Sequence, residues 1–251
     1  MAAKAVLFDL GNTLWHIPEP PPIDTIRQET MRRIGWLLRT WDVELKGDLR
    51  FLGRDIRLGL GAAMSHAYAG DLREPDPVAL AQRVAAEKGL ELTRAQADEL
   101  WRTWNLEGAF FGRRLFDDAI ETLNTLRARG YRVGCVTNRP FSGPAFQAEV
   151  EALGLTEHFE VMSISADLGY MKPHPQIFRH ALDGLGIAPD DAVMVGDSLR
   201  ADVAGAQALG MTAVWRRHNA IDEEIDDGIV PDFEINHLRE LLELAPLRDG
   251  A

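Results

Sequence analysis

The sequence predicts an α/β fold, in which a Rossmann-like, doubly wound parallel sheet forms the core and an all-helical domain is inserted after the first strand. From about residue 114 onward, apolar strand-like runs alternate with single helical stretches. Strands connected in this way lie parallel, with right-handed crossovers. Residues 18–113 show only helical periodicity. We therefore expect a core domain of residues 1–17 and 114–251 and an inserted helical domain of residues 18–113.

The strands of the predicted core are short and apolar. The first is AVLFD, which ends on Asp9 and runs into a tight Gly-Asn turn; the later ones are YRVGCVTN, FEVMSIS, AVMVGD, TAVW and the weaker DFEI. Helical stretches at 117–129 and 199–209 repeat apolar residues on one face. Ligands of such sheets bind at the carboxyl ends of the strands. Asp9, Thr137 and Asp197 all fall at those ends.

The inserted segment begins with IPEPPP, a stiff proline-rich exit from the first strand. Beyond it, apolar residues recur at helical spacing in four stretches, and REPDPVAL indicates a turn followed by a helix that starts on proline. The four predicted helices are 23–41, 54–69, 77–89 and 93–106. We expect no strand in this segment.

Composition argues against several classes of function. With 251 residues, 46% hydrophobic and 26% charged, the chain can bury a sizeable core. Its net charge of −12 argues against binding nucleic acid or an anionic membrane, and no run approaches the roughly 18 apolar residues that span a bilayer. Because the first apolar run is broken at Asp9, we expect no signal peptide. The single cysteine, Cys135, cannot form an internal disulfide and is predicted to be a buried thiol. We expect a cytoplasmic protein, either a monomer or a homodimer.

Polar residues suited to phosphate or metal binding occur at four places in the predicted core. Each has an ordinary structural interpretation when taken alone, such as a helix N-cap or a turn residue. Their occurrence together at separate strand ends favours one shared site. The four features are Asp9 with Gly11, Asn12 and Thr13; Thr137-Asn138; Lys172 in LGYMKPHPQIF; and VGDSLRADVAGAQALGM, which carries Asp197, Ser198 and Asp202.

Taken in order, these four features resemble the sequence motifs of the haloacid dehalogenase-like (HAD) superfamily of hydrolases. The inserted helical segment is similar in position to the C1 cap of subfamily I members, and the resemblance covers essentially the whole chain. It implies a Mg²⁺-dependent phosphatase that acts on a small phosphorylated metabolite through an aspartyl-phosphate. It does not name the substrate.

The resemblance also implies a nucleophile and a metal site. Asp9 is suited to attack phosphorus, which would give an aspartyl-phosphate that water then hydrolyses. Because a carboxylate repels a phosphate dianion, the site needs a cation, and oxygen ligands from Asp9 and Asp197 suit Mg²⁺. Family precedent adds the main-chain carbonyl of Gly11 as a further ligand.

The remaining residues of the expected site would bind the phosphoryl group or orient the residues that do. Lys172 would place positive charge on the phosphoryl oxygens and stabilise the charged nucleophile. The Thr137 hydroxyl and the Asn138 backbone N–H would donate to the same oxygens. Asp202 is expected to orient Lys172 or a metal-bound water without binding the metal itself. Ser198 would do the same or cap a helix.

Gly11 departs from the family's pattern, because most phosphatases of this family carry there an aspartate that protonates the leaving alcohol. General acid–base catalysis typically contributes about 10²–10⁴-fold, and neither glycine nor Asn12 can supply it. One interpretation is a phosphatase that uses leaving groups of low pKa, such as acyl, aryl or anomeric phosphates. Another is a proton relay from elsewhere, for which His16 and His174 are candidates.

Two further interpretations stay open. A phosphonoacetaldehyde hydrolase-like enzyme would cleave a C–P bond through a Schiff base on a lysine of the inserted domain, where Lys46 and Lys88 are the only lysines. A non-catalytic homologue would bind phosphate or a protein on the same fold. The dehalogenase branch of the family lacks the metal-binding acidic pair, so the presence of both Asp197 and Asp202 argues against a metal-free dehalogenase.

Overall fold

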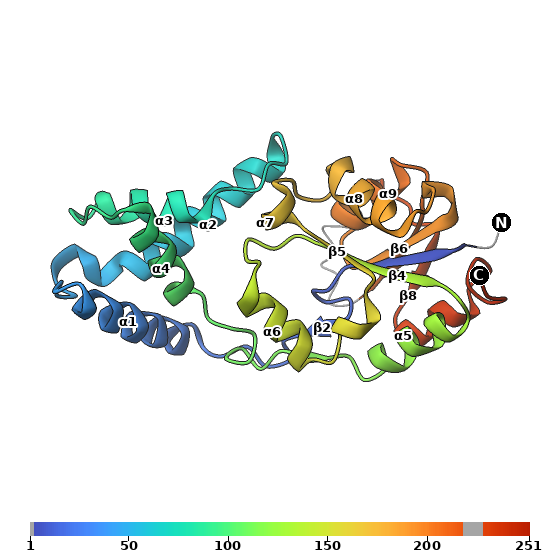
Figure 1. Ribbon diagram of the computed structural model, residues 1–251, viewed down its shortest axis with the longest axis horizontal. Coiled ribbons are helices and arrows are strands. Elements are labelled where there is room, and N and C mark those ends of the chain that lie inside the picture. The colour runs from blue at the N-terminus through green and yellow to red at the C-terminus, as the bar shows by residue number, and fades with distance from the viewer. Residues whose placement is uncertain (1–2, 218–227) are drawn as a thin grey trace. The chain divides into compact units, whose positions relative to one another are not determined.

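The computed structural model describes residues 3–217 and 228–251. The chain divides into two compact units, one formed by Met1–His16 with Arg113–Ala251 and the other by Ile17–Gly112. The first unit holds the sheet and the second holds helices α1 to α4 (Figure 1). Both division points lie one residue before the expected boundaries at 17/18 and 113/114.

The predicted α/β fold class is confirmed, since the first unit is built on a six-stranded sheet in the order β5-β4-β1-β6-β7-β8 with parallel pairing throughout. The chain winds outward from β1 in both directions, so the crevice beside β1 is the topological switch point at which such sheets bind ligands. The strands are β1 (Ala5–Phe8), β4 (Arg132–Thr137), β5 (Val161–Ile164), β6 (Ala192–Gly196), β7 (Thr212–Arg216) and β8 (Phe233–Ile235).

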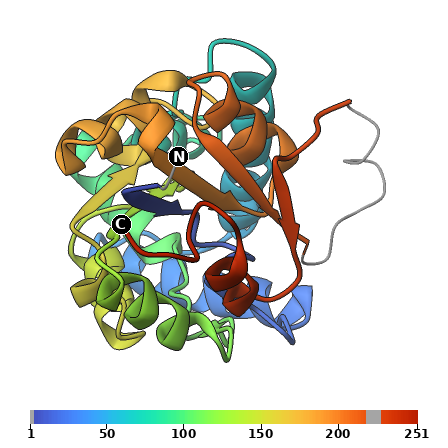
Figure 2. The ribbon, with the colours of Figure 1, turned by 90° about the vertical axis from the view of Figure 1, so that its right-hand side faces the viewer.

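Helices cover both faces of this sheet (Figure 2). Alternation along β1 shows the reason, because Val6 and Phe8 belong to the apolar cluster on one face and Ala5 and Leu7 to the cluster on the other. The first face is covered by α5 (Ala119–Ala128), α6 (Pro144–Ala152) and η6 (Leu238–Glu243). The second is covered by α8 (Pro175–Leu185), η4 (Leu199–Ala204) and α9 (Gly205–Gln207).

Among its described residues, the unit also contains three short helical turns, η2 (Thr156–His158), α7 (Ser165–Leu168) and η3 (Pro189–Asp191). The helix expected at 199–209 is in fact two elements, a π-helical turn η4 followed by α9. A second, two-stranded antiparallel sheet pairs β2 (Trp15–His16) with β3 (Arg114–Leu115). Sequence analysis did not predict this pair, because two-residue strands are too short to show an alternating pattern.

The second unit contains α1 (Ile23–Thr40), η1 (Gly47–Phe51), α2 (Leu52–Ala69), α3 (Pro77–Ala86) and α4 (Arg94–Trp104), so its regular elements are all helical, as predicted. Local signals set the helix starts. Asp76 accepts the N–H groups of Val78 and Ala79 ahead of α3, and Thr93 forms a capping box with Gln96 at α4. Over the described parts of the chain, every helix is too short or too polar to cross a membrane.

Candidate active site

The predicted site residues of the core meet at one edge of its sheet. Asp9 directly follows β1, Thr137 is the last residue of β4, and Asp197 directly follows β6. β1 pairs with both β4 and β6. Because neighbouring parallel strands end at the same edge, sequence positions almost 190 residues apart come together there.

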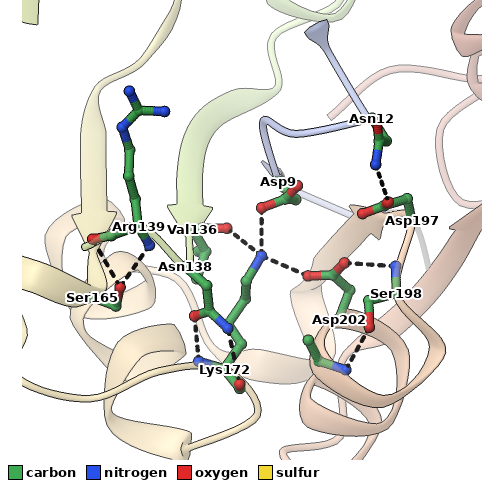
Figure 3. Close-up of polar contacts among 11 residues, drawn as sticks. Asp9, Asn12, Val136, Asn138, Arg139, Ser165, Lys172, Asp197, Ser198 and Asp202 are labelled. Atoms are coloured by element: carbon green, nitrogen blue, oxygen red, sulfur yellow. Dashed lines mark hydrogen bonds and ion pairs between the residues drawn. The ribbon is translucent and has the colours of Figure 1, made fainter. Parts of the chain in front are cut away.

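Lys172 lies at the centre of the site and is almost completely buried (Figure 3). Its Nζ donates to Asp9 Oδ1 at 2.6 Å, to Asp202 Oδ1 at 2.7 Å and to the Val136 carbonyl at 2.8 Å. All three ammonium protons therefore have acceptors. Burial by itself lowers the pKa of Lys172, but the two carboxylates together raise it above its usual value. The side chain is a fixed positive charge held between two acidic groups.

Asp202 has both carboxylate oxygens engaged, Oδ1 by Lys172 and Oδ2 by the Ser198 backbone N–H at 3.0 Å. Burial, the largest effect, raises the pKa of Asp202 to about 6, although Lys172 acts in the opposite direction. The Ser198 hydroxyl accepts the Ala201 N–H and so caps η4. Gly196 makes this packing possible, because a Cβ there would lie 2.2 Å from the Asp202 carboxyl carbon.

Asp197 completes a cluster of acidic groups. One ligand oxygen each from Asp9, Asp197 and Asp202 lies within 4.8 Å of the others. Burial raises the pKa of Asp197 to about 7, and the nearby charges of Asp9 and Asp202 contribute in the same direction. Its Oδ2 accepts from Asn12 Nδ2 at 3.1 Å, and its backbone carbonyl accepts from Trp215 Nε1 at 2.8 Å. The cluster is a set of crowded hard-oxygen donors, which a divalent cation would stabilise.

Asn138 makes contacts that sequence analysis did not foresee. Its side chain forms a reciprocal pair with the main chain of Lys172: Nδ2 donates to the Lys172 carbonyl at 3.0 Å, and Oδ1 accepts the Lys172 N–H at 2.6 Å. The buried Ser165 hydroxyl forms a similar reciprocal pair with the main chain of Arg139, the residue after Asn138. It accepts the Arg139 N–H at 2.7 Å and donates to the Arg139 carbonyl at 3.2 Å. The loop after β4 is thus hydrogen-bonded both to the loop that carries Lys172 and to Ser165 at the start of α7 (Figure 3).

The Asn138→Ala variant is expected to lose about 1–3 kcal/mol of unfolding free energy, because it leaves the Lys172 N–H and C=O without their partner. Chemical denaturation of the variant and the wild-type protein measures the loss. Asn236→Ala is the matched control, since that side chain is exposed. Equal stability of the two variants would contradict the assignment.

Gly11 occupies a position at which the backbone does not require glycine. It is Asn12 that has the left-handed conformation, with φ 51°, which asparagine tolerates. A Cβ added to Gly11 would meet only Asp9 Oδ2, at 3.9 Å. There is therefore room for a side chain beside the expected nucleophile.

The histidines considered as proton relays have other contacts. His16 stacks on Phe116 with ring centroids 4.1 Å apart, and burial together with Arg114 and Arg216 lowers the pKa of His16. His174 stacks on Tyr170, also at 4.1 Å, and its Nδ1 accepts the Gln176 N–H at the start of α8. His174 is therefore the N-cap of α8.

The two lysines considered for a Schiff base lie in ion pairs of the second unit. Lys46 pairs with Glu44 at 2.9 Å and is exposed, whereas Lys88 pairs with Asp55 and is 12% exposed. Each ammonium group is therefore engaged with a carboxylate. These contacts do not favour the C–P hydrolase interpretation.

These features define the class of the protein as an α/β fold with a buried lysine and an acidic cluster at the switch point of its parallel sheet. The chain belongs to the haloacid dehalogenase-like hydrolase family, whose family model matches residues 3–210. This confirms the family predicted from the four sequence motifs.

The relatives of the chain are named phosphatases and dehalogenases. It is 32% identical to a glyceraldehyde 3-phosphate phosphatase of Methanopyrus kandleri, with 96% of each chain covered. Among solved structures, it resembles a HAD phosphatase of Thermococcus onnurineus (30% identity, TM-score 0.58, 96% of each chain). It also resembles a 2-haloacid dehalogenase of Pseudomonas syringae (27% identity, TM-score 0.65, 97% of each chain). Its family and phosphatase-named relatives support a phosphoric monoester hydrolase.

Proposed function

We propose that this protein is a Mg²⁺-dependent phosphatase that hydrolyses a small phosphorylated metabolite through an aspartyl-phosphate on Asp9. The observation that carries the proposal is the buried Lys172, held between Asp9 and Asp202 beside Asp197. A dianionic phosphate needs this positive charge together with a metal ion. Displacement of a halide from a haloacid needs no metal ion, so the acidic cluster favours phosphate chemistry over dehalogenation.

The residues divide into those that react and those that hold them. The Asp9 carboxylate attacks phosphorus as the ester P–O bond breaks, and water then hydrolyses the acyl-phosphate to release inorganic phosphate. Lys172 orients the carboxylate through the 2.6 Å bond to Oδ1. The Thr137 hydroxyl and Asn138 backbone N–H stabilise the transferring oxygens. We further propose that the inserted domain, residues 18–113, acts as the cap that excludes water.

The residues present fit a hard divalent cation. Asp9, Asp197 and the Gly11 carbonyl would hold Mg²⁺, which supplies charge neutralisation at the phosphoryl group when bound. We assign Asp202 an orienting role outside the ligand set, because Lys172 and the Ser198 N–H each engage one of its oxygens.

A substrate panel tests the proposal. Purified protein is assayed with alkyl, aryl and acyl phosphates, phosphonoacetaldehyde and 2-haloacids, with Mg²⁺ and with EDTA. We expect Mg²⁺-dependent phosphate release from the phosphate esters or acyl phosphates. Turnover of phosphonoacetaldehyde alone, with a Schiff base trapped by borohydride, would replace the proposal with a C–P hydrolase. Turnover of the 2-haloacids alone would replace it with a dehalogenase. Binding of Mg²⁺ and phosphate without turnover would indicate a non-catalytic homologue.

In the metal-free protein, the contribution of Asp197 to stability is expected to fall as pH rises from about 4 to about 7. Burial raises the pKa of Asp197 from its usual range to about 7 in the folded state, so folding binds its proton more tightly and this contribution is fully present only below about pH 4. Added Mg²⁺ should raise the thermal midpoint at pH 8 but not at pH 5, where it competes with the proton. Thermal unfolding at both values, with Mg²⁺ or EDTA, measures this.

The control for this pH dependence is Asp197→Asn, which keeps the shape of the side chain and removes its ionisation. This variant should be at least as stable as the metal-free wild-type protein at pH 8 and should gain nothing from Mg²⁺. A variant that still gains stability from Mg²⁺ would remove Asp197 from the proposed ligand set.

A further inference from the structure

The last two residues of β7 contact the two loops that carry the proposed metal ligands. Trp215 Nε1 donates to the Asp197 carbonyl at 2.8 Å, and Arg216 Nη1 donates to the Asn12 carbonyl. Adjacent strand residues point to opposite faces of a sheet, so the two side chains reach these loops from opposite sides. Both are almost completely buried, with 3% and 2% of their surface exposed.

Burial of the Arg216 guanidinium carries a cost in desolvation free energy. Its guanidinium packs 3.6 Å from the centre of the Phe116 ring, and burial lowers its pKa while Asp118 and Asp197 raise it. Within residues 3–217 and 228–251, it has no carboxylate close enough for an ion pair, and its buried Nε has no acceptor. An apolar side chain of similar length would pack against Phe116 without this desolvation. The guanidinium is thus explained by its bond to the Asn12 carbonyl.

Asn12 connects both halves of the proposed metal site. Its φ of 51° forms the tight turn directly after Gly11, and its side chain donates to Asp197 Oδ2 at 3.1 Å. A bond to the Asn12 carbonyl restrains the peptide plane of that turn, next to the Gly11 carbonyl. The Trp215 bond restrains the Asp197 main chain by the same means.

We infer that Trp215 and Arg216 are positioning residues, which together set the separation between the Gly11–Asn12 turn and Asp197 for a divalent cation. This inference rests on the proposed function. Neither side chain touches the reacting atoms. Each acts through a backbone carbonyl, Trp215 through that of Asp197 and Arg216 through that of Asn12, the residue after Gly11. Groups that orient metal ligands in this way typically change metal affinity by about 10–100-fold.

Mg²⁺ titration calorimetry on the full chain without substrate tests this inference. Arg216→Met should weaken Mg²⁺ binding by about 10–100-fold. Arg216→Lys, which can still donate to the Asn12 carbonyl, should recover part of that loss. Arg248→Met is the matched control, because Arg248 is exposed and pairs with Asp249; it should bind Mg²⁺ as the wild-type protein does.

Circular dichroism and thermal unfolding in EDTA establish that each variant is folded before titration, since a merely structural role would lower stability and leave the Mg²⁺ affinity of the folded protein unchanged. A folded Arg216→Met protein with wild-type affinity overturns the inference. If that variant does not fold, Trp215→Phe decides in its place, with reduced affinity expected and unchanged affinity overturning it. A wild-type protein that binds no Mg²⁺ defeats the proposed function itself.

Discussion

Asp9→Asn is expected to lower phosphatase turnover by at least about 10⁴-fold, as removal of a covalent nucleophile does in other hydrolases. A carboxamide oxygen can still accept the Lys172 hydrogen bond, so the change removes nucleophilicity and charge with little change of shape. Steady-state phosphate release measures the loss. Rapid acid quench of the wild-type protein should trap a phosphoryl group on Asp9, and the variant should trap none.

Asp191→Asn controls for the general effect of losing a carboxylate. Asp191 lies just before β6, at the opposite end of that strand from Asp197, and pairs with the exposed Lys4 at 2.6 Å. Because exposed pairs contribute only about 0–1 kcal/mol, this variant should retain wild-type turnover. Undiminished hydrolysis by Asp9→Asn would end the aspartyl-phosphate mechanism.

Gly11→Asp is expected to raise the hydrolysis of alkyl phosphates by about 10²–10⁴-fold, the usual contribution of a general acid. The structure allows the change, because Gly11 does not have a positive φ and its added Cβ would contact only Asp9 Oδ2. Rates for a series of phosphates with leaving groups of different pKa give a second readout. The wild-type rates should rise steeply as the leaving group becomes more acidic, and the variant should show a flatter dependence.

Gly11→Asn is the matched control, since it adds nearly the same volume without a titratable proton. It should leave the dependence on the leaving group as steep as in the wild-type protein. If Gly11→Asp folds and binds Mg²⁺ but gains nothing on alkyl phosphates, then the chain obtains its proton from another group.

Fold similarity by itself does not choose between the two chemistries found among the solved relatives. The haloacid dehalogenase has a TM-score of 0.65 and the HAD phosphatase 0.58, so function has to be argued from the site. What favours phosphate chemistry is local. One carboxylate oxygen from each of three acidic residues lies within 4.8 Å of the others, beside a lysine with all three protons engaged.

Patterns in the amino-acid sequence were enough to predict the fold class, the family and the helical character of the inserted segment. Alternation of apolar strands with single helices requires a parallel sheet, and the carboxyl ends of its strands must then lie at one edge. Asp9, Thr137 and Asp197 could be placed at that edge for this reason. The departure at Gly11 could also be read from one position of one motif.

The contacts that hold these residues in place could not be predicted and are visible only in the folded chain. The bonds from Asn138 to the Lys172 main chain, from Ser165 to Arg139 and from Arg216 to Asn12 join positions 34, 26 and 204 residues apart. Such pairs leave no periodic trace in a sequence, because they depend on where loops from different strands end. For the same physical reason, the two engaged oxygens of Asp202, the capping role of His174 and the open space beside Gly11 became visible only once the chain was folded.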